Sequence, residues 1–167
     1  MAVVAPRRLV DVLARGSGVF QHAQTFSHHA TLCAAGVATI RYLKRHGLIE
    51  RCAAMGGVLH QRLQELRSFA CVGDVRGRGL LAGIEFVEDK VTRRPFPPSV
   101  RFAESFAATA LELGLIVWPN AGQLADGTGD LAMLAPPFVI DEHQISEMVA
   151  LLGRAVEQTV TQLAAAR

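Results

Sequence analysis

The sequence contains no apolar run close to the roughly 18–20 residues that a membrane-spanning helix needs, so we expect no membrane partner. Charged residues are also few, at 19%, and the 17 basic and 15 acidic side chains leave a net charge of only +2. Because these charges are scattered along the chain, nothing indicates a nucleic-acid partner. The first apolar patch precedes the first arginines, the reverse of the order in a signal peptide, and we therefore expect a cytoplasmic protein.

Paired cysteine motifs are missing as well. Cys33, Cys52 and Cys71 are odd in number and far apart, and no C-x-x-C pair occurs. This pattern predicts three reduced, mostly buried thiols in a cytoplasmic protein rather than a disulfide framework.

What the chain does contain is enough apolar sequence for a core. Its 167 residues, 50% of them hydrophobic, match one ordinary domain or one large piece of a bigger protein. No repeat or low-complexity tract is present. The pattern favours a helical first third followed by an α+β module, in which helices cover a short sheet.

The first half of the chain shows mainly helical spacing. We expect a short buried strand at residues 1–5, a helix that begins at Pro6 and ends at Gly16, a second helix from His29 to His46, and a third from Leu48 to Ser68. The pair Gly56–Gly57 either weakens the third helix or allows close packing against it.

From Val72 the period becomes that of strands. The sequence predicts two strands joined near Gly77 and Gly79, a helix from Ser99 to Leu113 ended by Gly114, a strand over 115–118 broken by Pro119, and a strand over 130–135. Asp141 is expected to cap a final helix, with Gln144 at the capping-box position.

The stretch GSGVFQHAQTFSHHA, Gly16 to Ala30, is unusually polar for this chain. His22, His28, His29 and Cys33 are possible zinc ligands, and a small zinc protein remains an alternative. However, His28 and His29 would point in different directions on a helix, and no carboxylate lies nearby in sequence to orient an imidazole. We interpret these histidines as helix-entry and packing residues and expect no metal.

Two other segments have residues that could contact a phosphate. Ser17, Thr25 and Ser27 offer hydroxyl donors shortly before a helix, where the positive end of the helix dipole favours an anion. Gly77, Gly79 and Ala82 fit the spacing G-x-G-x-x-A of a dinucleotide turn, but a strand and not a helix is expected to follow them.

An ion pair between two strand residues is also expected. Arg76 and Glu85 are placed to pair, and we interpret this as a structural ion pair rather than a catalytic one.

The order of several motifs resembles the C-terminal part of the class III aminotransferases, which are pyridoxal-phosphate enzymes of fold type I. The motifs are GSGVFQHAQTFSHHATLCAAGVATI, VGDVRGRGLLAGIEFVEDK, GLIVWP and GDLAMLAPPFVID, followed by an amphipathic helix. Together they extend over nearly the whole chain, from about Ala2 to Val160.

The resemblance implies a cofactor site shared between two chains. Thr25, beside Phe26, corresponds to the family threonine that reaches the cofactor phosphate of the other subunit, and Gly16–Phe20, with Ser17, resembles the loop that shapes the neighbouring active site. The family's Schiff-base lysine has no counterpart here, because Lys44 and Lys90 do not match its position. We therefore assign no catalytic residue in this chain.

These expectations define the organisation and the function. Residues 1–68 would form the end of the large cofactor domain with its connecting helices, and residues 69–167 the small C-terminal α+β domain. The whole enzyme would move an amino group from an amine or amino acid to a keto acid, as a homodimer or together with a complete aminotransferase chain. The isolated chain is expected to be inactive. The alternative is a non-catalytic subunit that completes an aminotransferase dimer.

Overall fold

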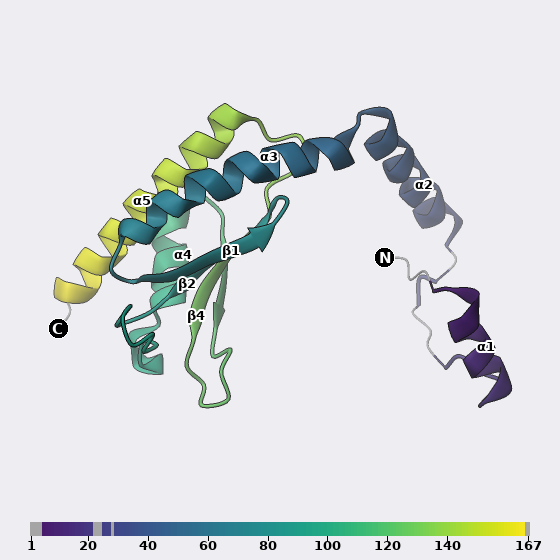
Figure 1. Ribbon diagram of the computed structural model, residues 1–167, viewed down its shortest axis with the longest axis horizontal. Coiled ribbons are helices and arrows are strands. Elements are labelled where there is room, and N and C mark those ends of the chain that lie inside the picture. The colour runs from purple at the N-terminus through teal and green to yellow at the C-terminus, as the bar shows by residue number, and fades with distance from the viewer. Residues whose placement is uncertain (1–4, 22–24, 28, 166–167) are drawn as a thin grey trace. The chain divides into compact units, whose positions relative to one another are not determined.

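The computed structural model describes residues 5–21, 25–27 and 29–165 (Figure 1). The chain forms two compact units, Met1–Tyr42 and Leu43–Arg167. The strand expected at residues 1–5 falls almost entirely outside the described residues.

The first unit contains two helices, α1 (Arg7–Arg15) and most of α2 (Ala30–Arg45). Pro6 immediately precedes α1, at a position whose N–H would have no partner within the helix, so the missing N–H of proline costs nothing there. Gly16 ends the helix as expected. No residue of α1 or α2 is buried, so within the described residues these helices have no core of their own.

The second unit begins with Leu43 and holds the remaining elements. They are α3 (Leu48–Leu63), η1 (Gln64–Ser68), β1 (Val72–Arg78), β2 (Leu81–Phe86), η2 (Pro98–Val100), α4 (Phe102–Glu112), β3 (Trp118–Ala121), β4 (Asp130–Leu134) and α5 (Glu142–Ala165).

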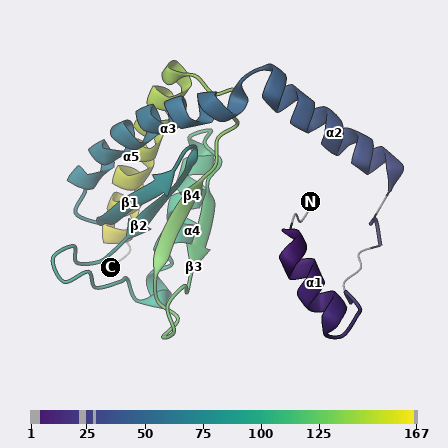
Figure 2. The same ribbon diagram turned by 45° about the vertical axis from the view of Figure 1, so that its right-hand side comes forward.

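The four strands form one antiparallel sheet in the order β1-β2-β4-β3, and α3, α4 and α5 pack against one of its faces (Figures 1 and 2). Alternation along the strands decides which side chains meet the helices. Val75 pairs with Ile84 and both are buried, whereas their neighbours Arg76 and Glu85 lie on the other face.

The core lies between the sheet and the helices and is built around phenylalanines. The Phe86 ring lies 4.8 Å, centroid to centroid, from both Phe102 and Phe106, and Phe96 stacks on Phe102 at 4.6 Å. Leu59 from α3 and Leu152 from α5 are fully buried beside this group. Such tilted and stacked ring pairs contribute about 0.5–1.5 kcal/mol each beyond the burial of their area.

Two predicted local features are confirmed in detail. The Asp141 carboxylate accepts a hydrogen bond from the Gln144 N–H at 2.8 Å, while the Gln144 side-chain oxygen accepts one from the Asp141 N–H at 3.1 Å. This reciprocal pair is a capping box, which satisfies two N–H groups at the start of α5. The expected ion pair between Arg76 and Glu85 also forms.

Three boundaries differ from those expected. The strand predicted over 115–118 begins only at Trp118, and it includes Pro119 rather than ending there. β3 is an edge strand, so half of its N–H positions face away from β4 and need no partner in the sheet. Proline, which has no N–H, can occupy such a position. The predicted helix from Leu48 to Ser68 finishes as the 3₁₀ turn η1, and the one predicted from Ser99 starts as α4 only at Phe102, after Arg101 in a left-handed conformation.

The fold class predicted from the sequence, α+β with a helical first third, is confirmed by this arrangement. Over the residues that the structure describes, no helix combines the length and the apolar character needed to cross a bilayer. The thiols are less uniformly buried than expected, because only Cys71 is buried, Cys52 is partly buried and Cys33 is exposed.

Candidate cofactor-contacting segment and cavities

The segment with the predicted cofactor contacts begins where α1 ends. The Gly16 N–H donates to the Val12 carbonyl at 2.9 Å, and the Gly18 N–H donates to the Leu13 carbonyl at the same distance. Gly18 has a φ of +70°, a left-handed conformation that glycine adopts without the steric cost of a Cβ. The two glycines of the GSG motif therefore close the helix and turn the chain.

The Ser17 hydroxyl is used inside this loop. Its Oγ donates to the Val19 carbonyl at 3.0 Å and accepts from the Val19 N–H at 3.4 Å. A hydroxyl held in this way shapes the loop backbone and has less capacity left for a ligand. Ser17 is exposed, as is the whole described part of the segment.

Thr25 and Phe26 lie in an exposed turn just before α2. The Phe26 ring is 71% exposed, and its backbone carbonyl accepts a hydrogen bond from the His29 N–H at 3.4 Å. Thr25 is also exposed, and its hydroxyl makes no hydrogen bond to any described residue. Thr25 therefore remains able to donate to an anion near the start of α2.

The zinc hypothesis depends partly on His22 and His28, which lie outside the described residues. His29 and Cys33 are both exposed and one helical turn apart, with the Cys33 N–H bonded to the His29 carbonyl at 3.0 Å. Within the described ranges no three metal-ligating side chains gather at one place.

The apolar side chains of this first unit are unusually exposed. Phe20 is 71% exposed and Val12 60%, and in α2 Leu32, Ile40 and Tyr42 are each more than half exposed. So many exposed large apolar side chains are typical of a region that another protein surface covers.

In the second unit the residues of the supposed dinucleotide turn lie in a hairpin. Gly77 pairs with Ala82 between β1 and β2, and a strand, not a helix, follows Gly79. The turn therefore presents no helix N-terminus to a pyrophosphate, as the sequence had indicated.

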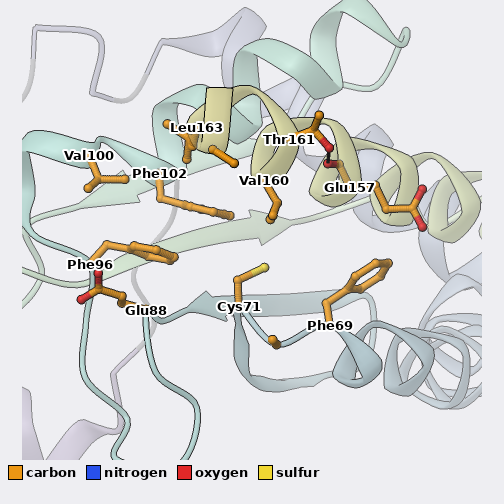
Figure 3. A pocket seen from close by; sticks show the side chains of 12 residues that line it. Phe69, Cys71, Glu88, Phe96, Val100, Phe102, Glu157, Val160, Thr161 and Leu163 are labelled. Carbon is orange, nitrogen blue, oxygen red and sulfur yellow. Dashed lines mark hydrogen bonds between the residues drawn. The ribbon is translucent and has the colours of Figure 1, made fainter. Parts of the chain in front are cut away.

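The second unit also contains an apolar cavity of about 500 Å³ beside the C-terminal end of α5 (Figure 3). Phe96, Phe102 and Leu163 contribute to its walls, and the Cys71 side chain lies between them and Phe69. Burial raises the pKa of the Cys71 thiol, which favours its protonated form. No lysine lines the cavity, and its few carboxylates, such as Glu157, lie at the rim, so it has no group that could form a Schiff base.

The lysines lie elsewhere. Lys90 is exposed, and its ammonium group donates to the Arg67 backbone carbonyl. Lys44 is exposed in the last turn of α2. Neither lysine lines any of the cavities described for the second unit.

Comparison with protein families identifies a single family over most of the chain. The model of the class-III aminotransferases matches residues 1–156. Among curated relatives, the uncharacterized aminotransferase YodT of Bacillus subtilis is 35% identical over 156 residues, which are 93% of this chain and 35% of that protein. A diaminobutyrate–2-oxoglutarate transaminase of Halomonas elongata is 34% identical over 165 residues, 96% of this chain and 34% of its own length.

Solved structures agree with the sequence relatives. A transaminase from the marine bacterium Virgibacillus superposes with a TM-score of 0.81 at 28% identity, covering 93% of this chain and 35% of that one. A Bacillus anthracis aminotransferase gives a TM-score of 0.75 at 35% identity, covering 86% and 31%. The chain thus spans about a third of the length of the curated relatives it matches.

Proposed function

The chain belongs to the class-III aminotransferase family, and we propose that it forms the C-terminal part of an enzyme that transfers an amino group from an amine or amino acid to a keto acid. A relative named as a diaminobutyrate–2-oxoglutarate transaminase supports a reaction of this type. The family implies pyridoxal phosphate as cofactor, which would hold the migrating amino group.

The observation that carries the proposal is the position of Thr25. Its hydroxyl is exposed and makes no hydrogen bond to any described residue, and it lies on a turn that leads into α2, where a phosphate is favoured. In the proposed enzyme Thr25 donates a hydrogen bond to the cofactor phosphate, which is held mainly by another chain. Ser17, whose hydroxyl is bonded to Val19, sets the shape of the preceding loop, and the exposed Phe26 ring lies against the same neighbouring surface.

The described residues fit only the phosphate group of the cofactor. The Lys90 ammonium group is occupied at the Arg67 carbonyl, and Lys44 is an exposed residue at the end of a helix. Neither lysine lines any of the cavities described above, so neither lies in an enclosed site suited to Schiff-base chemistry. We therefore propose that the isolated chain is inactive and that the Schiff-base lysine is on other polypeptide.

The first experiment uses the chain alone. After incubation with pyridoxal phosphate and reduction with borohydride, we expect no stoichiometric label on either lysine. A stable, specific label on Lys44 or Lys90 would overturn the assignment of the catalytic lysine to other polypeptide.

The second experiment tests Thr25 in an active assembly. We would fuse this chain to the preceding two-thirds of B. subtilis YodT and measure cofactor affinity and amino transfer. Thr25→Val removes one hydrogen bond to a charged group and should weaken cofactor binding roughly tenfold or more. Thr25→Ser, which keeps the hydroxyl, should bind nearly normally, and Thr31→Val, an exposed threonine of α2, serves as the matched control. Equal losses for the two valine variants would contradict the role of Thr25.

A second candidate function is a non-catalytic subunit that completes an aminotransferase dimer. The observation in its favour is the exposed apolar surface of the first unit, represented by Val12, Phe20 and Ile40. In this case the chain would associate stably with a complete class-III aminotransferase chain carrying its own lysine. Sedimentation of the mixed proteins separates the two functions, because a subunit should form a complex without being fused.

A further inference from the structure

A charged pocket of about 450 Å³ lies on the second unit, and none of its lining residues belongs to the first unit. It is lined by three arginines, two carboxylates and two small or apolar residues: Arg67, Arg76, Arg93, Asp74, Glu85, Gly73 and Val87. We propose that this pocket binds a small oxyanion, a carboxylate or a phosphate, with Arg93 as the residue that gives it affinity. This inference does not depend on the proposed function.

The charges of the pocket do not cancel. Asp74 accepts hydrogen bonds from both Arg67 and Arg76, and Glu85 accepts a second one from Arg76. These four side chains are neutral as a group. Arg93 has no carboxylate within ion-pair distance among the described residues, so it leaves one positive charge uncompensated.

The hydrogen-bonding capacity also favours an anion over a cation. Each arginine has five N–H donors in a planar fork. The bonds formed inside the described chain use only Nη2 of Arg67 and Nη1 of Arg76, so several donors remain for a ligand. The two carboxylates, in contrast, already accept from guanidinium groups, and a cation would have to displace them.

The backbone is irregular at the places that shape the pocket. A β-bulge at Gly73 interrupts the pairing of β1, so that Val72 and Val75 both face the core while Asp74 points to the opposite face. Glycine is favoured at the bulge, because a Cβ there would lie 2.7 Å from a Val87 methyl group and would force that side chain to move. Without the bulge Asp74 could not meet both arginines.

The loop that carries Arg93 is built by specific hydrogen bonds. The Asp89 carboxylate accepts from the Val91 and Thr92 N–H groups at 2.8 and 3.1 Å, and the main chains of Asp89 and Arg94 pair. Arg93 itself has a φ of +58°, a left-handed conformation that a residue with a side chain adopts only when the surrounding structure holds it there.

A hydrogen bond connects this loop to the pocket. The Lys90 ammonium group donates to the Arg67 carbonyl, which joins the loop to η1 and adds positive charge beside the pocket. The loop and the bulge together place three guanidinium groups around one cavity, and guanidinium is the group that best matches carboxylate and phosphate geometry.

The test titrates the chain with succinate and, separately, with inorganic phosphate at constant ionic strength, following binding by calorimetry or amide chemical shifts. We expect saturable binding of at least one anion in the millimolar range. Arg93→Gln should weaken that binding about tenfold, because it removes a charge-assisted pair. Arg154→Gln, which removes the same charge from an exposed position of α5, should change it less than twofold. Tighter binding of phosphate than of succinate identifies a phosphate ligand, and the reverse order identifies a carboxylate.

Two results would overturn the proposal. One is the absence of saturable binding for both anions. The other is an equal loss for Arg93→Gln and Arg154→Gln, which would mean that only the overall charge matters. Arg93→Lys gives a second measurement, since it keeps the charge but not the fork, and we expect binding between that of the native chain and Arg93→Gln. Thermal unfolding of each variant verifies that the fold is retained.

Discussion

The contact between α3 and the hairpin β1–β2 offers a test with a built-in control. A Cβ added at Gly56 would lie 2.6 Å from the backbone Cα, C and O atoms of Gly79. Real Cβ atoms do not approach so closely, and Gly79 is itself held at a φ of +56°. At the next residue, Gly57, an added Cβ meets no atom within 4 Å. Both glycines occupy the interior of the same helix.

The two alanine substitutions should therefore have opposite effects. In a helix interior alanine is more favourable than glycine by about 1 kcal/mol, so Gly57→Ala should stabilise the unit by that amount. Gly56→Ala gains the same helix propensity but must move α3 away from a backbone that cannot rotate aside. Overpacking of this kind costs about 1–3 kcal/mol. Taking the upper value, the net loss is about 2 kcal/mol, and the two variants differ by about 3 kcal/mol.

Urea unfolding followed by tryptophan fluorescence measures this difference directly. The only tryptophan, Trp118, lies on β3, so the signal reports the second unit and not the first. The midpoint should fall for Gly56→Ala and rise for Gly57→Ala, with the same dependence on urea in both. If the two midpoints moved in the same direction, the close approach of Gly56 to Gly79 would not be what selects glycine at this position.

Three further substitutions or measurements follow from the second unit and the thiols. The buried Asp130 carboxyl accepts from the Ala103 N–H at 3.0 Å, and burial together with Glu104 raises its pKa above the ordinary 3.8. The stability that this group contributes is therefore greatest below pH 3.8, and it falls as the pH rises through the raised pKa. Asp130→Asn, which keeps the acceptor, should reduce this pH-dependent fall in the urea midpoint. Asp130→Ala should lower the free energy of unfolding by about 1–3 kcal/mol. Asp141→Ala removes the cap of α5 and should cost about 1 kcal/mol by urea unfolding. A thiol reagent should label exposed Cys33 in the native chain well before Cys71, whose thiol is buried and has a raised pKa; equal rates would contradict this.

Features with a local cause were the ones that the sequence predicted well. The capping box of Asp141 and Gln144 depends on residues three apart, and the end of α4 at Gly114 depends on one residue that adopts a φ of +88°. The strand containing Pro119 was placed too early because its start depends on pairing with β4, which brings Trp118 opposite Met133. Local propensity favours a strand over 115–118, but only residues with a partner strand form one.

The candidate sites divide in the same way. The proposed role of Thr25 rests mainly on the resemblance to a family, because its place before a helix suits a phosphate contact but does not distinguish it from Ser17 and Ser27. The pocket at Arg93 was not predicted at all, because it joins η1, two strands and a loop through a bulge that leaves no distinctive pattern. The only sequence signal was the ion pair of Arg76 and Glu85, which lie diagonally across the β1–β2 hairpin, since Arg76 pairs with Gly83 and Glu85 with Asp74.

The two units differ in what holds their functional residues in place, and this has a consequence for the proposed enzyme. Arg93 belongs to a unit with a core, whereas the loop before Thr25 is held by local bonds such as that from Gly18 to Leu13. A side chain that contacts a cofactor must be held within about 0.5 Å of its working position, and a loop held only by local bonds does not supply that precision. In the proposed enzyme, the surface that covers the first unit would therefore position Thr25 as well as bring the cofactor. We expect polar substitution of exposed apolar residues such as Phe20 to weaken association and cofactor binding together, whereas Thr25→Val should weaken only cofactor binding.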